Sequence, residues 1–470
     1  MRTRDTIDEQ MTPPEPGQDR SKSTSWLARI GAIFVVALVV GASAIVFAQL
    51  GQHHKSQPSN LSNLSVPPPG KWVQVLNGYT LSSLSAADSN PSILYACAVH
   101  SQASAPQATT SNNTSYTILR STDFGARWQD IGSSAALGSS CQLAVNPGNS
   151  NELYAIGLPN AAQATNILKH SMDGGQTWTT ISPALSMPGN RSAPVWNVEQ
   201  LSMVGNALFG VQLMPQDTNP TVQRGVLPRY YARLNRLVTS TDGGRTWTVL
   251  DQQFTTSWQT VSSYAVDPVH TGTIYVLVSI PTLPVQPKTE EPRVPTVYSS
   301  SFDLYKTTDN GATWQPLLQN LPFATQVQLA RSNPQTIYIG GTRSPLPVSR
   351  EAPVYDNINT FGFHLQVSTD GGATWRQVPD LPQASQAFSV LAWFVGSNGQ
   401  VYFYPAGSPN SPSSQGSIQR YDPSRDAWNE VTRPPIDGSL LAVTSGGATS
   451  DVLWFIGISK GQSLTYRYAV

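Results

Sequence analysis

The sequence has little charge of either sign. Aspartate, glutamate, lysine and arginine together make up 12% of its 470 residues, and 28 basic side chains balance 28 acidic ones. Proteins bind nucleic acids mainly through basic side chains that contact phosphate, so this composition argues against a nucleic-acid partner. Any partner has to be recognised through shape and hydrogen bonds.

Cysteine and histidine are scarce as well. The chain contains 2 cysteines and 6 histidines, and none of them stands at the spacing of a metal-binding motif. We therefore expect neither a metal site nor any other cofactor.

Long apolar runs are missing apart from one segment near the N-terminus. Ile30 to Leu50 contains no charged residue, and as a helix it spans about 32 Å at about 1.5 Å per residue, which matches a membrane core. The basic residues before it predict a single-pass anchor with a cytoplasmic N-terminus and an exported chain. The alternative is a signal peptide cleaved near Ala48, which would make the protein secreted.

The anchor divides the chain into four expected parts. Residues 1–29 are polar and rich in proline and charge, which predicts a disordered cytoplasmic tail. Residues 30–50 form the anchor helix, and residues 51–70, rich in Pro and Ser, form a linker. Residues 71–470 contain the folded domain.

A short motif, Ser/Thr-x-Asp-x-Gly-x-x-Trp, occurs five times in this domain. Each copy predicts a tight turn between antiparallel strands, because Asp and Gly suit turn backbones and the Ser/Thr and Asp side chains can bond backbone amides. In the first copy, Phe124 and Arg127 stand where Gly and Thr usually occur. The Asp and Trp residues of the five copies are Asp123 and Trp128, Asp173 and Trp178, Asp242 and Trp247, Asp309 and Trp314, and Asp370 and Trp375.

A second element, an apolar and aromatic strand such as Leu94-Tyr95-Ala96, occurs seven times, most often after an Asn-Pro or Asp-Pro turn. Units of about 50 to 70 residues suit the four-stranded blades of a propeller. The last unit lacks its outer strand, whereas Trp72 to Leu76 has the form of an outer strand without a preceding turn motif. We therefore predict an all-β, seven-bladed β-propeller whose ring is closed by its N-terminal strand, preceded by one transmembrane helix.

The turn motif resembles the Asp-box, or bacterial neuraminidase repeat, of the sialidase-like propellers. The resemblance covers Trp72 to Val470 and implies the propeller fold, with the boxes at the outer edge of the blades. It extends to propellers like the photosystem II assembly factors and the sortilin-type receptor domains, which bind proteins, rather than to active sialidases. The Phe/Tyr-Arg-Ile-Pro motif of the active enzymes is absent, and Lys71 to Asp88 contains no arginine. We assign no catalytic residue.

Five polar or Pro-rich inserts recur at one position of the units, between the expected second and third strands. They are residues 101–115, 215–229, 281–297, 344–359 and 405–417. Loops at a fixed position lie on one face of a ring, which makes this face the candidate binding surface; tolerated surface insertion is the alternative. One insert and the strand after it carry side chains suited to a glycan, because Arg pairs with carboxylates and Tyr stacks on sugars. A solvated loop is the alternative reading of these residues, which are Arg224, Arg229, Tyr230, Tyr231, Arg233 and Arg236.

Cys97 and Cys141 are expected in inner strands of the first two units. They either form a disulfide between neighbouring blades, which suits an exported domain, or remain buried thiols that act as small apolar residues.

The function that the sequence favours is an extracytoplasmic recognition or scaffolding module for a protein or glycan at the cell surface. An exo-glycosidase acting on extracellular glycans is the alternative.

Overall fold

The structure is a computed structural model in which Met1–Ala42 and Ser43–Val470 form separate units. All described residues lie in the second unit, so the tail, the anchor Ile30 to Leu50 and most of the linker are outside them. In the described part of the chain, no helix is long and apolar enough to cross a membrane. The described residues are 68–100, 116–132, 137–138, 140–157, 166–186, 196–213, 235–251, 259–281, 300–322, 324–342, 363–381, 392–405, 416–446 and 450–470.

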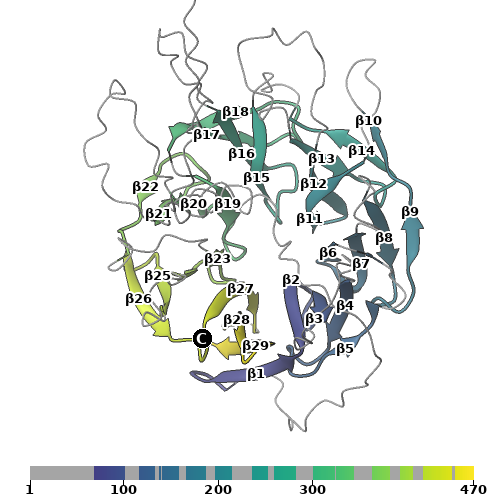
Figure 1. Ribbon diagram of the computed structural model, residues 1–470. Helices are drawn as coiled ribbons and strands as arrows, with labels where there is room; N and C mark the ends of the chain where they lie inside the picture. Colours follow the sequence, from purple (N-terminus) through teal and green to yellow (C-terminus); the bar gives the residue numbers. More distant parts are fainter. Residues whose placement is uncertain are drawn as a thin grey trace, which may run out of the picture. The chain divides into compact units, whose positions relative to one another are not determined.

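Seven antiparallel sheets stand around a common centre (Figure 1). We number the blades along the chain and give each from its inner to its outer strand. Blade 1 is β2 (Tyr79–Ala87), β3 (Asn90–His100), β4 (Tyr116–Ser121) and β5 (Gln129–Asp130); blade 2 is β6 (Cys141–Asn146), β7 (Asn149–Gly157), β8 (Ile167–Ser171) and β9 (Thr179–Ile181); blade 3 is β11 (Val198–Val204), β12 (Ala207–Gln212), β13 (Arg236–Ser240) and β14 (Thr246–Val249).

The remaining blades follow the same order. Blade 4 is β15 (Thr260–Val266), β16 (Ile274–Pro281), β17 (Ser300–Thr307) and β18 (Gln315–Leu321); blade 5 is β19 (Gln326–Leu329), β20 (Ile337–Thr342), β21 (Phe363–Ser368) and β22 (Arg376–Gln377); blade 6 is β23 (Ala392–Val395), β24 (Val401–Tyr404), β25 (Ile418–Asp422) and β26 (Ala427–Thr432); blade 7 is β27 (Gly438–Ser445), β28 (Asp451–Ser459), β29 (Gln462–Ala469) and β1 (Trp72–Asn77).

Blade 3 has one additional strand that the sequence did not predict. The segment after blade 2 forms β10 (Ala184–Ser186), which pairs in parallel with β14 at the outer edge of blade 3. The chain between two blades therefore contributes to the second of them.

The core lies between the blades rather than inside one layer. Each cluster of buried side chains combines residues of two neighbouring blades, as where Leu168 of blade 2 packs with Val198 and Trp247 of blade 3. The second strand of each blade is covered on both faces and is therefore a nearly continuous apolar run, for example Leu153 to Gly157 in β7.

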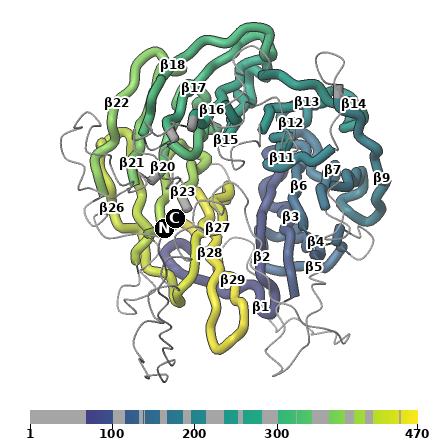
Figure 2. Tube along the Cα trace, turned by 45° about the horizontal axis from the view of Figure 1, so that its top comes forward, coloured from purple at the N-terminus to yellow at the C-terminus, as the bar shows by residue number. Residues whose placement is uncertain are grey.

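The ring closes as the sequence predicted. β1 pairs antiparallel with β29, with Trp72 opposite Tyr468 and Val73 opposite Arg467, and Trp72 Nε1 donates a hydrogen bond to Thr432 Oγ1 of blade 6 at 3.0 Å. Figures 1 and 2 both show β1 beside β29, so the first described strand completes the last blade. The pairing covers two sheet edges that would otherwise be exposed.

The expected strand positions of the cysteines need one correction. Cys141 lies in an inner strand, β6, but Cys97 lies in β3, the second strand of blade 1. A disulfide joins the two residues, with their Cα atoms 5.8 Å apart, so the bond links blade 1 to blade 2. The prediction failed for Cys97 because alternating small residues occur in both kinds of strand.

The four strands of each blade alternate in direction, which gives the ring two different ends. The connections between second and third strands leave at one end, which we call the insert end. The connections between first and second strands and the turns before the fourth strands lie at the other, which we call the turn end. The strand bounds place all five predicted inserts between second and third strands, and hence at the insert end.

We predict that removing residues 71–77 from the full chain makes the domain sensitive to protease, because blade 7 then loses its outer strand and β29 becomes an open edge. The measurement is limited proteolysis, with removal of residues 106–112 from the first insert as the matched control. The control is expected to keep wild-type resistance. Equal resistance of the two deletion variants would contradict the closure.

Candidate functional site

The five Ser/Thr-x-Asp motifs form turns of one geometry at the turn end, and we call them Asp turns. In the second, Ser171 Oγ donates to Asp173 Oδ1 at 2.8 Å and accepts from the Gly175 amide at 2.9 Å, while Asp173 Oδ1 also accepts from the Thr177 amide at 2.9 Å. The same bonds recur in the other four turns. These side chains hold the turn backbone, as the sequence predicted from their chemistry.

A threonine fixes the carboxylate in four of the five Asp turns. Its hydroxyl donates to the second carboxylate oxygen at 2.6 Å, as Thr313 does to Asp309. This hydroxyl bond is the largest cause that lowers the pKa of the carboxyl to about 2 in Asp173, Asp242, Asp309 and Asp370. The carboxylates therefore stay charged at any ordinary pH and serve the turn rather than a reaction.

The first Asp turn departs from the others at the positions that the sequence singled out. Phe124 adopts φ 56°, a left-handed conformation that three of the other turns give to glycine and one to Asn310. Arg127 replaces the threonine, and its Nε lies 3.3 Å from Asp123 Oδ2. An exposed guanidinium thus takes the place of the hydroxyl bond.

The indole nitrogens separate the first turn from the rest. Trp178, Trp247 and Trp375 each donate from Nε1 to the glycine carbonyl of their own turn at 2.9 to 3.1 Å, and Trp314 donates to the Leu250 carbonyl at 3.1 Å. Trp128 Nε1 is buried and has no hydrogen-bond partner. Its ring instead meets Trp454 of blade 7 edge-on, with the ring centroids 5.9 Å apart.

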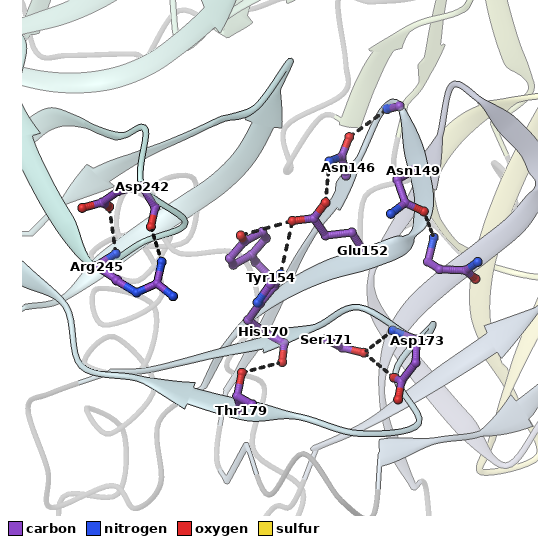
Figure 3. Close-up of polar contacts among 12 residues, drawn as sticks. Asn146, Asn149, Glu152, Tyr154, His170, Ser171, Asp173, Thr179, Asp242 and Arg245 are labelled. Atoms are coloured by element: carbon purple, nitrogen blue, oxygen red, sulfur yellow. Dashed lines mark hydrogen bonds and ion pairs between the residues drawn. The ribbon is translucent and has the colours of Figure 1, made fainter.

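A polar cluster that the sequence did not predict lies between blades 2 and 3 (Figure 3). Glu152 Oε1 lies 3.2 Å from His170 Nε2 and accepts from the Tyr154 hydroxyl at 3.3 Å, while its Oε2 accepts from Asn146 Nδ2 at 2.7 Å. Tyr154 and His170 stack with their centroids 4.3 Å apart. Burial and the charge of Glu152 raise the pKa of Tyr154 to about 12, so its hydroxyl stays protonated.

The Tyr154 hydroxyl of this cluster lies against the Asp turn of blade 3. A side chain at Gly243, in the Asp turn of blade 3, would come within 3.2 Å of the Tyr154 hydroxyl. The carboxylate, imidazole and phenol of the cluster all have partners within blade 2. The paired acid and tyrosine that a sialidase-like reaction uses are thus side by side here, but they are packed against a neighbouring turn.

The inner strands that surround the centre of the ring carry few charged side chains. The inner strands β2, β6, β11, β15, β19, β23 and β27, which stand nearest the centre in Figure 1, contain one charged residue, Glu199. Amide side chains bridge neighbouring inner strands: Gln142 Oε1 accepts from the Leu201 amide at 3.2 Å, and Gln328 donates to the Trp393 carbonyl at 3.0 Å. Glycoside hydrolysis usually needs two opposed carboxyl groups, and these strands do not supply them.

The turn end of the centre is crossed by an ion pair. Arg331 of blade 5 and Asp88 of blade 1 lie 2.5 Å apart between Nη1 and Oδ1, although these blades are not neighbours.

At the insert end, buried polar side chains gather where blade 3 faces blade 2. Arg236 Nη1 lies 3.7 Å from Oδ2 of Asp251, whose side chain is fully buried. Burial raises the pKa of Asp251 to about 7 against the opposing charge of Arg236. Two other buried atoms, Asn166 Oδ1 and Trp196 Nε1, belong to residues just before β8 and β11 and have no hydrogen-bond partner.

The backbone explains why these side chains come together. Gln212 at the end of β12 is opposite Arg236 at the start of β13, and opposite Val198 at the start of β11. Asn166 of blade 2 donates from Nδ2 to the Val198 carbonyl at 3.0 Å. We call Asn166, Trp196, Gln212, Arg236 and Asp251 the blade-3 polar cluster.

Only one residue of the predicted glycan site lies in the described chain. Arg236 belongs to the blade-3 polar cluster, whereas Arg224, Arg229, Tyr230, Tyr231 and Arg233 are outside the described residues. The sequence analysis missed Asn166, Trp196 and Asp251. A comparison of the repeats with one another gives a signal for Asp251, because a carboxylate directly follows the apolar end of the strand Trp247 to Leu250.

No protein-family model matches the chain, and no curated protein matches its sequence. Solved structures match its fold.

The fold is that of a seven-bladed β-propeller. The chain is similar to a structure of YCF48 bound to a D1 peptide, at 13% identity over 86% of this chain and 97% of that one, with a TM-score of 0.45. It is also similar to the β-propeller domain of the Trilobed protease from Pyrococcus furiosus, at 10% identity, 83% and 97% coverage and a TM-score of 0.47. An α-L-arabinanase of Penicillium chrysogenum complexed with arabinobiose matches at 13% identity, 86% and 98% coverage and a TM-score of 0.41. These likenesses concern the fold alone.

We predict that acid unfolds the domain through its Asp turns. The four lowered carboxyl pKa values give stability that is present above the unfolded value of 3.8 and is lost as the pH falls toward about 2. Thr313→Val removes the hydroxyl that holds Asp309, so the unfolding temperature of this variant should depend less steeply on pH between 4 and 2. Thr308→Val, which changes an exposed threonine of the same turn, is the control. A pH dependence that is equal in both variants would show that the hydroxyl bond does not set this pKa.

We also predict that the two turn tryptophans Trp178 and Trp128 respond differently to loss of the indole nitrogen. Trp178→Phe removes a hydrogen bond, which contributes about 1 kcal/mol, whereas Trp128→Phe removes none. The free energy of unfolding, measured with denaturant, should fall by about 1 kcal/mol more for Trp178→Phe, because both variants lose similar ring area. An equal loss for the two would mean that Trp128 has a partner in solution.

Proposed function

We propose that this protein is a non-catalytic recognition module that binds a protein or glycan at the insert end of its propeller. The observation that carries the proposal is the common origin of the inserts. Five polar or Pro-rich inserts start and end at the same end of seven stacked sheets. Their sequences can vary without changing the blades, which is how rigid scaffolds present binding loops.

The blade-3 polar cluster supports a binding role at this end. Arg236 begins β13 directly after the insert that carries the predicted arginines and tyrosines, so a ligand held by the insert lies near the cluster. Arginine, tryptophan, asparagine and glutamine are side chains that recognise hydroxyl and carboxylate groups. The cluster is therefore the part of the described chain that we expect to support such a ligand.

We further propose that the module stands outside the cytoplasm, held at the membrane by Ile30 to Leu50, with secretion after cleavage near Ala48 as the alternative. The disulfide between Cys97 and Cys141 supports an exported domain, because disulfides persist mainly in oxidising compartments.

An exo-glycosidase is the second candidate, and one observation favours it. A carboxyl group whose pKa is near neutral, such as that of Asp251, has the property of a catalytic acid. However, Asp251 is fully buried beside Arg236, and the inner strands supply only Glu199 as a possible second carboxylate. The recognition role requires no such pair.

The test uses the full chain in lipid nanodiscs. Its binding to glycans and its turnover of fluorogenic glycosides are measured, and crosslinking of the chain to surface proteins identifies protein partners. We expect binding without turnover. Replacing residues 215–229 with a Gly-Ser segment of equal length should weaken the binding by at least about tenfold if this insert carries anchor residues. Arg245→Ala, at the turn end, is the matched control and should bind normally. Turnover of a glycoside, or binding that survives exchange of every insert, would refute the proposal.

A further inference from the structure

A cavity of about 360 Å³ opens at the first Asp turn, at the end of the ring opposite to the inserts. It is an open hollow in the surface rather than an enclosed pocket. The lining residues come from the end of β4, the turn and the start of β5. They are Arg120, Thr122, Asp123, Arg127, Trp128 and Gln129.

The lining coincides with the departures of this turn from the other four. Arg127 stands where the others have threonine, and its side chain is 64% exposed. The Trp128 indole nitrogen has no acceptor in the turn, unlike its four counterparts. Arg120 Nε also has no hydrogen-bond partner. Both unpaired atoms are donors that lie buried beneath the cavity lining, whereas the outer nitrogen Arg120 Nη2 and the Arg127 Nε have partners in Asn151 and Asp123.

The charge around the cavity is positive. Arg120 and Arg127 line it, and Asp123 is the one carboxylate in the lining. Asp123 Oδ1 already accepts from the Ser121 hydroxyl and the Arg127 amide, and its Oδ2 pairs with Arg127 Nε. The carboxylate thus holds the turn and balances one of the two arginines.

A third guanidinium lies behind the turn. Arg467 of β29 is fully buried and donates from Nη1 to the Phe124 carbonyl. Burial lowers the pKa of Arg467 to about 10, which leaves it protonated at neutral pH. Asp173 of the next Asp turn stays ionised, since hydrogen bonds from Ser171 and Thr177 stabilise its carboxylate, and its charge partly offsets those of the guanidinium groups.

The other contacts of Arg120 place it firmly at the cavity. Its Nη2 donates to Asn151 Oδ1 of blade 2 at 3.2 Å, and its guanidinium lies 5.9 Å from the centre of the Tyr95 ring. Arg120 is therefore positioned before any ligand arrives, whereas the exposed Arg127 can move to meet one. A preorganised cation beside a mobile one is a suitable arrangement for an oxyanion.

We propose that this cavity binds a small oxyanion, sulfate or phosphate, either free or carried on a sugar. Arg127 and Arg120 pair with the anion, and the Trp128 ring, with Thr122 and Gln129, contacts the group that carries it. The site stands apart from the proposed function, because it is built from described residues at the turn end and does not involve the inserts.

The test is isothermal titration of the full chain in nanodiscs with glucose 6-sulfate, glucose 6-phosphate, inorganic sulfate, inorganic phosphate and glucose. Arg127→Thr restores the residue found in the other four turns, so it should keep the wild-type unfolding temperature and bind each oxyanion at least about tenfold more weakly. Arg245→Ala removes an exposed arginine from the Asp turn of blade 3 and should bind like the wild type.

The ligand series identifies the source of the anion. Tighter binding of the sugar esters than of the inorganic ions supports a sugar-borne anion, and equal binding supports the free ion, provided that Arg127→Thr weakens both. The proposal is wrong if the wild type binds none of the oxyanions, if glucose binds as tightly as its esters, or if Arg127→Thr binds like the wild type. It is also wrong if Arg245→Ala weakens binding as much as Arg127→Thr.

Discussion

The ring depends on an aromatic side chain in the second strand of each blade that contacts the next blade. The Tyr95 hydroxyl donates to the Ser150 carbonyl of blade 2 at 2.9 Å, the Tyr338 hydroxyl to the Gly399 carbonyl of blade 6 at 2.7 Å, and the Tyr402 hydroxyl to Asp451 of blade 7 at 3.0 Å. Each ring also buries a large apolar area against its neighbour, and the hydroxyl finds an acceptor at the far side. Because the core lies between blades, no blade can keep its buried faces without both neighbours.

Cationic side chains opposite the aromatic residues of the second strands reinforce the contacts between blades. Arg120 is opposite Tyr95, Lys306 is opposite Tyr275 and Arg467 is opposite Trp454, each on the adjoining third strand. Lys306 donates to the Gly371 carbonyl of blade 5 at 2.8 Å, and Arg467 reaches the first Asp turn from blade 7. Neighbouring blades thus contact one another at the Asp turns. This contact explains why the carboxylates of the turns bond the turn backbone.

Closure of the ring accounts for the unusual first turn. Trp454 packs so closely on Gly125 that a side chain there would overlap its ring, and Arg467 binds the Phe124 carbonyl. The turn that receives the last blade therefore differs from turns that receive an ordinary neighbour. Trp128 of this turn packs against Trp454 and does not bond the glycine carbonyl of the turn. The charged cavity opens beside it.

The sequence by itself determined the turns, the repeated strands and the number of blades. Turn chemistry is set by residues within a few positions of one another, so Ser171 and Asp173 could be assigned their bonds, and the outer-strand form of Trp72 to Leu76 predicted its pairing. Only the tertiary structure decided which side chains of different strands and blades meet. Glu152 with His170, Arg236 with Asp251, and Arg467 with Phe124 are brought together by strand register and blade stacking, which a single sequence does not encode in any fixed spacing. The same reason explains why the cavity at Arg127 was not predicted, although its two unusual residues had been noticed.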